Sequence, residues 1–197
     1  MTKQRAGLAN GKARRGNAPG LSHVTSDGRA TMVDVGEKPV TARSATAEAF
    51  VRISPELEAR IRQGTIAKGP VLEVARLAGI QAAKRTDELI PLCHSLPLDG
   101  VDVTAQVESG RVRITATART HARTGVEMEA LVAVTLAALT VLDMGKAVDK
   151  AMVIEGVRVL EKRGGRSAVY AASSLAQDKR ERTGRGGERG GSRRRSP

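Results

Sequence analysis

The stretch LDGVDVTAQVESGRVRITATAR, residues 98–119, alternates apolar and polar side chains on both sides of Ser109–Gly110. Strict alternation is typical of strands with one buried face, and a Ser-Gly pair between two such runs indicates a tight turn. The stretch therefore predicts an antiparallel β-hairpin. Its apolar row consists of Val101, Val103, Ala105 and Val107, continued by Val112, Ile114 and Ala116.

A long strand and two helices are predicted before the hairpin. Residues 38–53 are rich in Thr, Val and Ala and contain no turn residue after Pro39, which favours a strand. The next segment predicts a helix with Ser54 as its N-cap and Pro55 as its first residue. Gly64 would end this helix. A second helix is predicted over about residues 70–84. Its apolar face would consist of Val71, Val74, Leu77 and Ala78.

A long helix and a final strand are predicted after the hairpin. The helix covers residues 125–149 and is apolar almost all round between Ala130 and Leu142. A domain this small covers only one side of such a helix, so we expect a partner subunit on the other. The strand covers residues 152–162, and its apolar parity changes across Gly156, which indicates a β-bulge.

The resulting order is β-α-β-β-α-β, with an extra helix in the first crossover. This order favours an α+β fold with a ferredoxin-like antiparallel sheet and helices on one face, in an oligomeric protein. We expect a catalytic domain over residues 23–170. Basic, disordered tails would occupy residues 1–22 and 171–197.

The formal net charge of +12 lies mostly at the two ends of the chain. Residues 1–20 and 173–197 together carry ten of these positive charges, so the body is nearly balanced. An alternative function is nucleic-acid binding through the C-terminal RGGERGGSRRR segment. The body offers only Phe50 and Tyr170 for base stacking, so we expect the tails to add weak nucleic-acid binding at most.

Composition and motifs exclude several other classes. One cysteine and three histidines form no disulfide framework and no Cys-rich zinc site, and they fit a reducing compartment. The N-terminal residues lack the apolar block of a secretory signal, and the uncharged run from Ala130 to Leu142 is too short to cross a bilayer. We therefore expect a soluble, cytoplasmic protein. Since no P-loop, G-x-G-x-x-G or G-x-S-x-G motif is present, side chains or helix ends must hold any phosphate.

The long helix carries charged residues at both ends. Asp143, Lys146 and Lys150 share one face, either as a solvated salt-bridging stripe or as a partly desolvated carboxylate beside a lysine, which suits proton transfer. At the other end, Thr124 and Glu127 match the S/T-x-x-E capping box. The capping box does not account for Glu129.

A Cys93–His94 pair lies between Pro91 and Pro97. Alone, Cys93 is typical of a small buried residue and His94 of a hydrogen-bonded structural histidine, and a Cys-His nucleophilic site is the alternative. Lys68 and Lys162 are either surface lysines or, with Lys146, cations for a polyphosphate.

Six segments taken together resemble one enzyme family. They are MVDV (32–35), KG (68–69), AGIQAAKRT (78–86), LIPLCH (89–94), TGVEMEAL (124–131) and LTVLDMGKAV (139–148). Their order and residues resemble those of the cyclic pyranopterin monophosphate synthases, the MoaC family of molybdenum cofactor biosynthesis. The resemblance runs from about His23 to Ser167, which is essentially the whole folded body.

The resemblance implies a lyase that acts on (8S)-3′,8-cyclo-7,8-dihydroguanosine 5′-triphosphate, the product of a radical-SAM enzyme. It would form cyclic pyranopterin monophosphate and release pyrophosphate. The family pattern implies a homo-hexamer, a trimer of dimers, with active sites between subunits. It requires no cofactor or resident metal and allows Mg²⁺ to accompany the triphosphate. By the same resemblance the catalytic residues are Asp143, Lys68, Lys146 and Lys162, and the substrate contacts are Leu92, Cys93, His94, Glu127, Met128 and Glu129.

Three positions depart from the family pattern. Ser95 follows the histidine where the family often has proline, so the loop is expected to differ slightly. Gly145 occupies the variable position of the D-M-x-K element, where glycine weakens a helix by about 1 kcal/mol relative to alanine. Ala168 replaces the usual glycine after the GG[KR]S element. None of these changes removes a proposed catalytic group.

Overall fold

The computed structural model describes residues 28–165 and 169–172. The chain divides into two units, residues 1–33 and 34–197. The described part of the first unit, residues 28–33, contains no helix. The fold therefore belongs to the second unit. The predicted N-terminal tail (1–22) and Ala168 lie outside the described residues.

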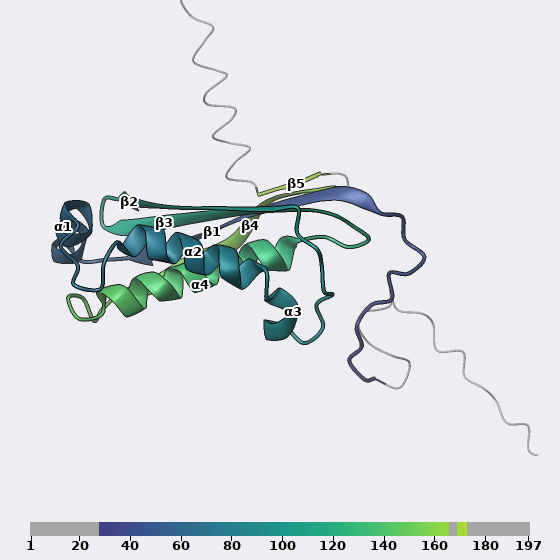
Figure 1. Cartoon of the computed structure of the whole chain (residues 1–197), viewed down its shortest axis with the longest axis horizontal. Helices are drawn as coiled ribbons and strands as arrows, with labels where there is room; N and C mark the ends of the chain where they lie inside the picture. Colours follow the sequence, from purple (N-terminus) through teal and green to yellow (C-terminus); the bar gives the residue numbers. More distant parts are fainter. Residues whose placement is uncertain (1–27, 166–168, 173–197) are drawn as a thin grey trace, which may run out of the picture. The chain divides into compact units, whose positions relative to one another are not determined.

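The second unit is built on an open antiparallel sheet of five strands (Figure 1). The sheet order is β2-β3-β1-β4-β5, and every neighbouring pair is antiparallel. This arrangement confirms a mixed fold of helices and an antiparallel sheet. The strands are β1 (Thr41–Arg52), β2 (Gly100–Glu108), β3 (Arg111–Ala122), β4 (Val153–Arg163) and β5 (Val169–Ala171).

The core lies on one face of the sheet and consists of small aliphatic side chains. Val51 pairs with Val112 and Ala49 with Ile114, and all four are fully buried. Successive side chains of a strand point to opposite faces, so the alternation in residues 98–119 places this row toward the helices. The predicted hairpin, with its turn at Ser109–Gly110, is confirmed.

The helices are α1 (Pro55–Gln63), α2 (Val71–Ala83), α3 (Thr86–Leu89) and α4 (Glu127–Gly145). Figure 1 shows α2 and α4 side by side on the same face of the sheet. The predicted limits of α1 are confirmed, because Ser54 accepts a hydrogen bond from the Leu57 N–H and Gly64 ends the helix at φ 69°. The short helix α3 was not predicted.

The buried face of α2 includes Val71, as predicted, but otherwise differs from the predicted one. Val74 and Leu77 are exposed, whereas Ala75 and Gly79 are buried. A Cβ placed on Gly79 would lie 2.9 Å from the Ala133 carbonyl oxygen of α4. Small residues let two helix backbones approach closely, so α2 turns its small side chains, rather than its large ones, toward α4.

We expect Gly79→Ala to lower the free energy of unfolding by about 1–3 kcal/mol, because backbone atoms of α4 cannot yield to the new methyl group as a flexible side chain would. Alanine is a better helix former than glycine by about 1 kcal/mol, and the steric cost of the new methyl group exceeds this gain. Denaturant unfolding would measure it. Ala78→Gly in the same helix is a control for propensity alone, and a Gly79→Ala protein more stable than the wild type would contradict the packing.

The predicted final strand is confirmed, and its bulge is present. Register shifts on β1 fall between Thr46 and Ala47 and between Glu48 and Phe50, and Gly156 of β4 has φ 64°. Because β5 pairs with the end of β4, the sheet extends to Ala171, one residue into the predicted disordered tail. The tail prediction was wrong at that residue, and residues 173–197 lie outside the described chain.

Among the described residues, α4 is the one helix long and apolar enough to cross a membrane by length and composition. Its packing is that of a core helix, since it contacts β1, β3 and α2 and many of its side chains are fully buried. It is also shorter than predicted, ending at Gly145 rather than at residue 149. Lys150 therefore lies beyond the helix and not on one helical face with Asp143.

Candidate functional site

Three of the predicted residues meet at the C-terminal end of α4. The Lys68 Nζ lies 2.7 Å from Asp143 Oδ2 and also donates to the Asp143 carbonyl oxygen at 2.8 Å. The Lys146 Nζ lies 2.7 Å from Asp143 Oδ1. Lys68 precedes α2, which runs antiparallel to α4, and Lys146 follows one turn after Asp143. We call Asp143, Lys68 and Lys146 the Asp143 cluster.

The charge state of Asp143 differs from the expected one. Its side chain is 57% exposed, so it is not the partly desolvated carboxylate of the sequence prediction. Hydrogen bonds from Lys146 and Lys68 lower its pKa from 3.8 to about 2. Asp143 is thus ionised at neutral pH and holds two ammonium groups together, which leaves a surplus of positive charge facing solvent.

A second group lies at the opposite end of α4. The Lys162 Nζ of β4 is 3.1 Å from Glu127 Oε1. The predicted capping box does not form, because the helix begins after Val126 and has no side-chain cap. A Cβ on Gly125 would overlap the Glu127 carboxylate, so the glycine makes room for this side chain.

Glu129 is the buried acid of this end. Its side chain is 4% exposed, and its Oε2 has no hydrogen-bond partner among the described residues. Burial raises its pKa from 4.5 to about 7, and the nearby charges of Glu127 and Asp87 add to the increase. Glu129 therefore exchanges a proton near neutral pH, which makes it the candidate acid–base group that the sequence analysis sought at Asp143.

The raised pKa predicts a pH-dependent effect of Glu129→Gln on stability. The unfolded chain ionises above about pH 4.5, whereas the folded chain resists ionisation up to about pH 7. The cost to the folded state is absent below pH 4.5, grows between these values and is complete above pH 7, at about 3 kcal/mol. We therefore expect the glutamine variant to be more stable than the wild type at pH 8.

Urea unfolding at equal protein concentrations from pH 4 to 8 measures this difference. The stabilisation by Glu129→Gln should disappear as the pH falls to 4. A wild type that is the more stable protein at pH 8 would show that Glu129 is ionised without cost in the fold.

The loop at residues 90–99 lies beside Glu129. Burial, together with the charge of Glu129, raises the pKa of the Cys93 thiol, so Cys93 is a poor nucleophile at neutral pH. His94 is half-buried, and Leu92 and Met128 are 38% and 37% exposed. The loop thus presents apolar and polar groups next to a protonatable acid. We call Glu127, Glu129, Lys162 and residues 92–94 the Glu129 cluster.

Asp87 was missed by the sequence analysis. It lies on α3, accepts a hydrogen bond from the Ser95 hydroxyl, and raises the pKa values of Glu129 and Cys93 by its charge. Ser95 was noted only as a departure from the family's proline. An Asp followed eight residues later by a serine next to the histidine was the available signal, but only the fold brings the two together.

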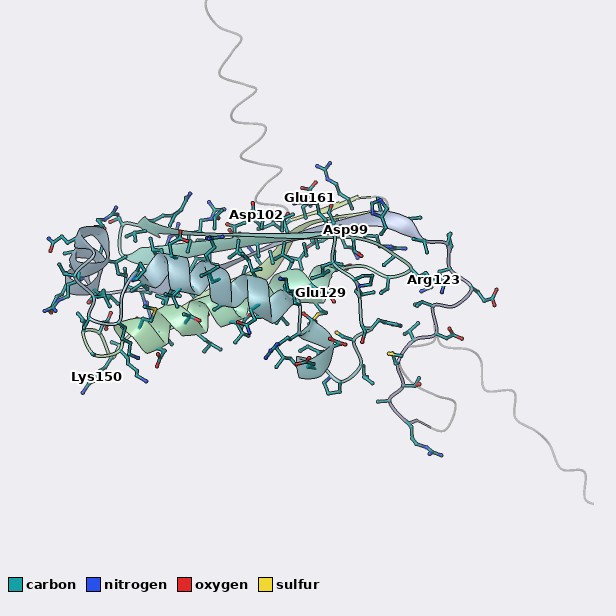
Figure 2. The ribbon with its side chains drawn as sticks, in the orientation of Figure 1. Asp99, Asp102, Arg123, Glu129, Lys150 and Glu161 are labelled. Atoms are coloured by element: carbon teal, nitrogen blue, oxygen red, sulfur yellow. The ribbon has the colours of Figure 1, made fainter. Side chains whose placement is uncertain are left out.

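The two clusters do not meet within one chain. Glu129 and Asp143 are fourteen residues apart on a straight helix, which separates them by about 21 Å at 1.5 Å per residue. Figure 2 shows Glu129 toward one end of the helical layer and Lys150, which follows the Asp143 cluster, at the other. Asp143 and Lys146 therefore do not share a pocket with His94 within a single chain.

Comparisons with known proteins agree on one family. Residues 32–165 match the MoaC family. The chain is 55% identical over 163 residues to cyclic pyranopterin monophosphate synthase 1 of Mycobacterium bovis, which covers 81% of this chain and 96% of the relative. The protein of the same name from Mycobacterium tuberculosis has the same identity and coverage.

Proposed function

The chain belongs to the MoaC family, and from this premise we infer that it is a cyclic pyranopterin monophosphate synthase. It is a lyase of molybdenum cofactor biosynthesis. It converts (8S)-3′,8-cyclo-7,8-dihydroguanosine 5′-triphosphate into cyclic pyranopterin monophosphate and pyrophosphate. The substrate is the product of a radical-SAM enzyme, which links the two proteins functionally.

The observation that supports the mechanism is the contrast between the two clusters. The Asp143 cluster holds two exposed ammonium groups in fixed positions, which suits a polyphosphate leaving group. The Glu129 cluster holds a buried acid that titrates near pH 7, which suits proton transfer to and from ring nitrogens. The reaction needs both properties, because it rebuilds a purine ring and expels pyrophosphate.

A second copy of the chain would bring the clusters together. A two-fold axis across α4 would make the two copies of the helix antiparallel, so that the Asp143 cluster of one chain faces the Glu129 cluster of the other. The outer surface of the helical layer suits this contact, since large apolar side chains are exposed there. They are Val74 and Leu77 of α2 and Met128 and Leu139 of α4.

Each residue then has a role in a composite site. Lys68 and Lys146, fixed by Asp143, neutralise charge on the triphosphate and on the departing pyrophosphate. Glu129 transfers a proton, and Lys162 with Glu127 completes the charged wall. Leu92, Cys93, His94 and Met128 contact the guanine-derived ring, and Cys93 serves as a contact rather than a nucleophile. The proposal requires no resident cofactor, and Mg²⁺ would enter only with the triphosphate.

We extend the proposal to assembly and location. The subunit would have a ferredoxin-like topology and form a hexamer, a trimer of dimers, in the cytoplasm. The strand order β2-β3-β1-β4 and the exposed apolar residues of α2 and α4 support this assembly. The basic tails would bind nucleic acid only weakly, so deletion of residues 173–197 should leave catalysis intact.

The direct test is incubation of the full chain with the cyclic dihydro-GTP substrate. We expect the pterin product and pyrophosphate in equal amounts. Chromatography with fluorescence detection measures the pterin, and a coupled assay measures the pyrophosphate. Release of pyrophosphate without pterin would indicate a simple pyrophosphohydrolase, and no conversion of the substrate would contradict the proposed activity.

A further inference from the structure

A cavity of about 390 Å³ opens on β1, β3 and β4, and nothing in the proposed reaction uses it. Its lining includes three arginines, Arg43, Arg119 and Arg163, and one carboxylate, Asp99. Asp99 is at the end of the sheet that lies away from Lys150 (Figure 2). The size and charge of the cavity raise the question of which anion it would hold.

The sheet register places two of these arginines on either side of a small residue. Ser44 of β1 pairs with Arg119 of β3 and with Arg163 of β4. Side chains of paired residues point to the same face, and neighbouring strands lie about 4.8 Å apart, so the two arginine Cα atoms are about 10 Å apart across Ser44. Two long guanidinium side chains at this spacing can close around one phosphate group.

The arginines are held in position by different contacts. Arg43 donates from Nε to the Ala122 carbonyl at 3.1 Å, and Arg163 pairs with Glu161 at 2.7 Å. Arg119 lies over Gly100, where a Cβ would be 3.1 Å from its terminal nitrogen. Within residues 28–165 and 169–172, the Arg119 guanidinium has no hydrogen bond or ion pair, so its charge is available to a ligand.

The one carboxylate of the lining, Asp99, already has a hydrogen-bond partner. The Asp99 Oδ2 lies 2.7 Å from His121 Nδ1, so the one carboxylate of the lining faces a histidine. Arg163 is balanced by Glu161, so the positive charge left open to a ligand on this face is that of Arg119, whose guanidinium has a forked donor geometry. Guanidinium groups bind two oxygens of one anion at a time, which favours an oxyanion over a simple halide, and the cavity of about 390 Å³ has room for a phosphate.

The arginine pair is on the opposite face of the sheet from the Glu129 cluster. Lys162, which contacts Glu127, pairs with Ala45, a buried residue of the helix-covered face. Arg163 and Ser44 come next on their strands and point the other way. We infer that this cavity is a binding site for a small phosphate-bearing anion, separate from the reaction site. Free pyrophosphate and the phosphate chain of a nucleotide share the required chemistry.

The test is titration calorimetry of the full chain with inorganic pyrophosphate and, in a second arm, with GTP. We expect Arg119→Ala to weaken binding of the preferred anion about tenfold or more, since charged hydrogen bonds are lost. Asp99→Asn should strengthen it, because repulsion is removed. Arg111→Ala is the matched control, on the same strand and face but about 27 Å away at 3.4 Å per residue.

Two further measurements distinguish anion binding in this cavity from binding at the reaction site. Lys68→Ala should leave the Arg119-dependent binding unchanged, and Arg119→Ala should leave the KM for the reaction substrate unchanged. Tighter binding of pyrophosphate identifies the free anion as ligand, and tighter binding of GTP identifies the nucleotide. Because these affinities are measured without catalysis, they test the anion site independently of the proposed function.

Three results would overturn the inference. They are equal affinity of the wild type and Arg119→Ala, weaker binding by Asp99→Asn, and a raised KM in Arg119→Ala that places the cavity in the reaction site. Arg119→Lys provides a second variant if Arg119→Ala fails to fold, because lysine keeps the positive charge but loses the forked donor geometry. It should weaken anion binding in the same direction.

Discussion

Asp143→Asn is expected to lower kcat by about 10²–10³-fold while the protein remains folded. The neutral amide cannot hold the two ammonium groups that lie 2.7 Å from the carboxylate oxygens in the wild type. Lys68 and Lys146 would then repel each other and leave the positions that suit a polyphosphate. Since Asp143 is more than half exposed, its ion pairs add little to stability, and the loss is one of positioning.

Steady-state kinetics of pyrophosphate release measures this loss, and circular dichroism checks the fold. Glu73→Gln is a suitable control, because it removes an exposed Arg76 ion pair elsewhere in the helical layer. The control should retain wild-type turnover. Near-normal kcat in Asp143→Asn would show that the carboxylate does not organise the lysines for the reaction.

Glu129→Gln is expected to lower kcat by a similar factor of about 10²–10⁴ for a different reason. The glutamine keeps the shape of the side chain but cannot give or take a proton. The wild-type rate should change with pH around 7, where Glu129 titrates, and this inflection should be absent from the residual activity of the variant.

The pH–rate profiles of the wild type and Glu129→Gln are compared between pH 5 and 9. Glu88→Gln, on the same short helix as Asp87, changes a nearby exposed acid and should leave the inflection in place. An inflection near pH 7 that persists in Glu129→Gln would assign the titration to another group.

Much of the fold follows from local patterns. The alternation in residues 98–119 predicts β2, β3 and their turn, and Ser54, Pro55 and Gly64 predict the limits of α1. The buried face of α2 could not be predicted in this way, because periodicity treats Leu77 as a better core residue than Gly79. The choice depends on how closely the α4 backbone approaches, which is a property of the whole layer.

The residues of the two clusters were singled out from the sequence, but their charge states were not predicted. Asp143 interrupts an apolar helix, which suggests burial, yet it lies at the helix end, where two lysines and solvent surround it. The capping box leaves Glu129 unexplained in the sequence, and its raised pKa arises from burial and from the charges of Glu127 and Asp87. Charge states of this kind depend on long-range packing. The residue pattern therefore indicates which side chains to consider, but only the fold shows which of them are buried or paired.

Complementation between inactive variants tests the central proposal, a site shared by two chains. Asp143→Asn and Glu129→Gln proteins are unfolded together, refolded as a mixture and assayed for pyrophosphate release. Random pairing of two-fold dimers gives mixed dimers in about half of the cases, each with one intact site, so about a quarter of wild-type activity should return. Activity no higher than that of the separate variants would contradict a composite site and place the chemistry within a single chain.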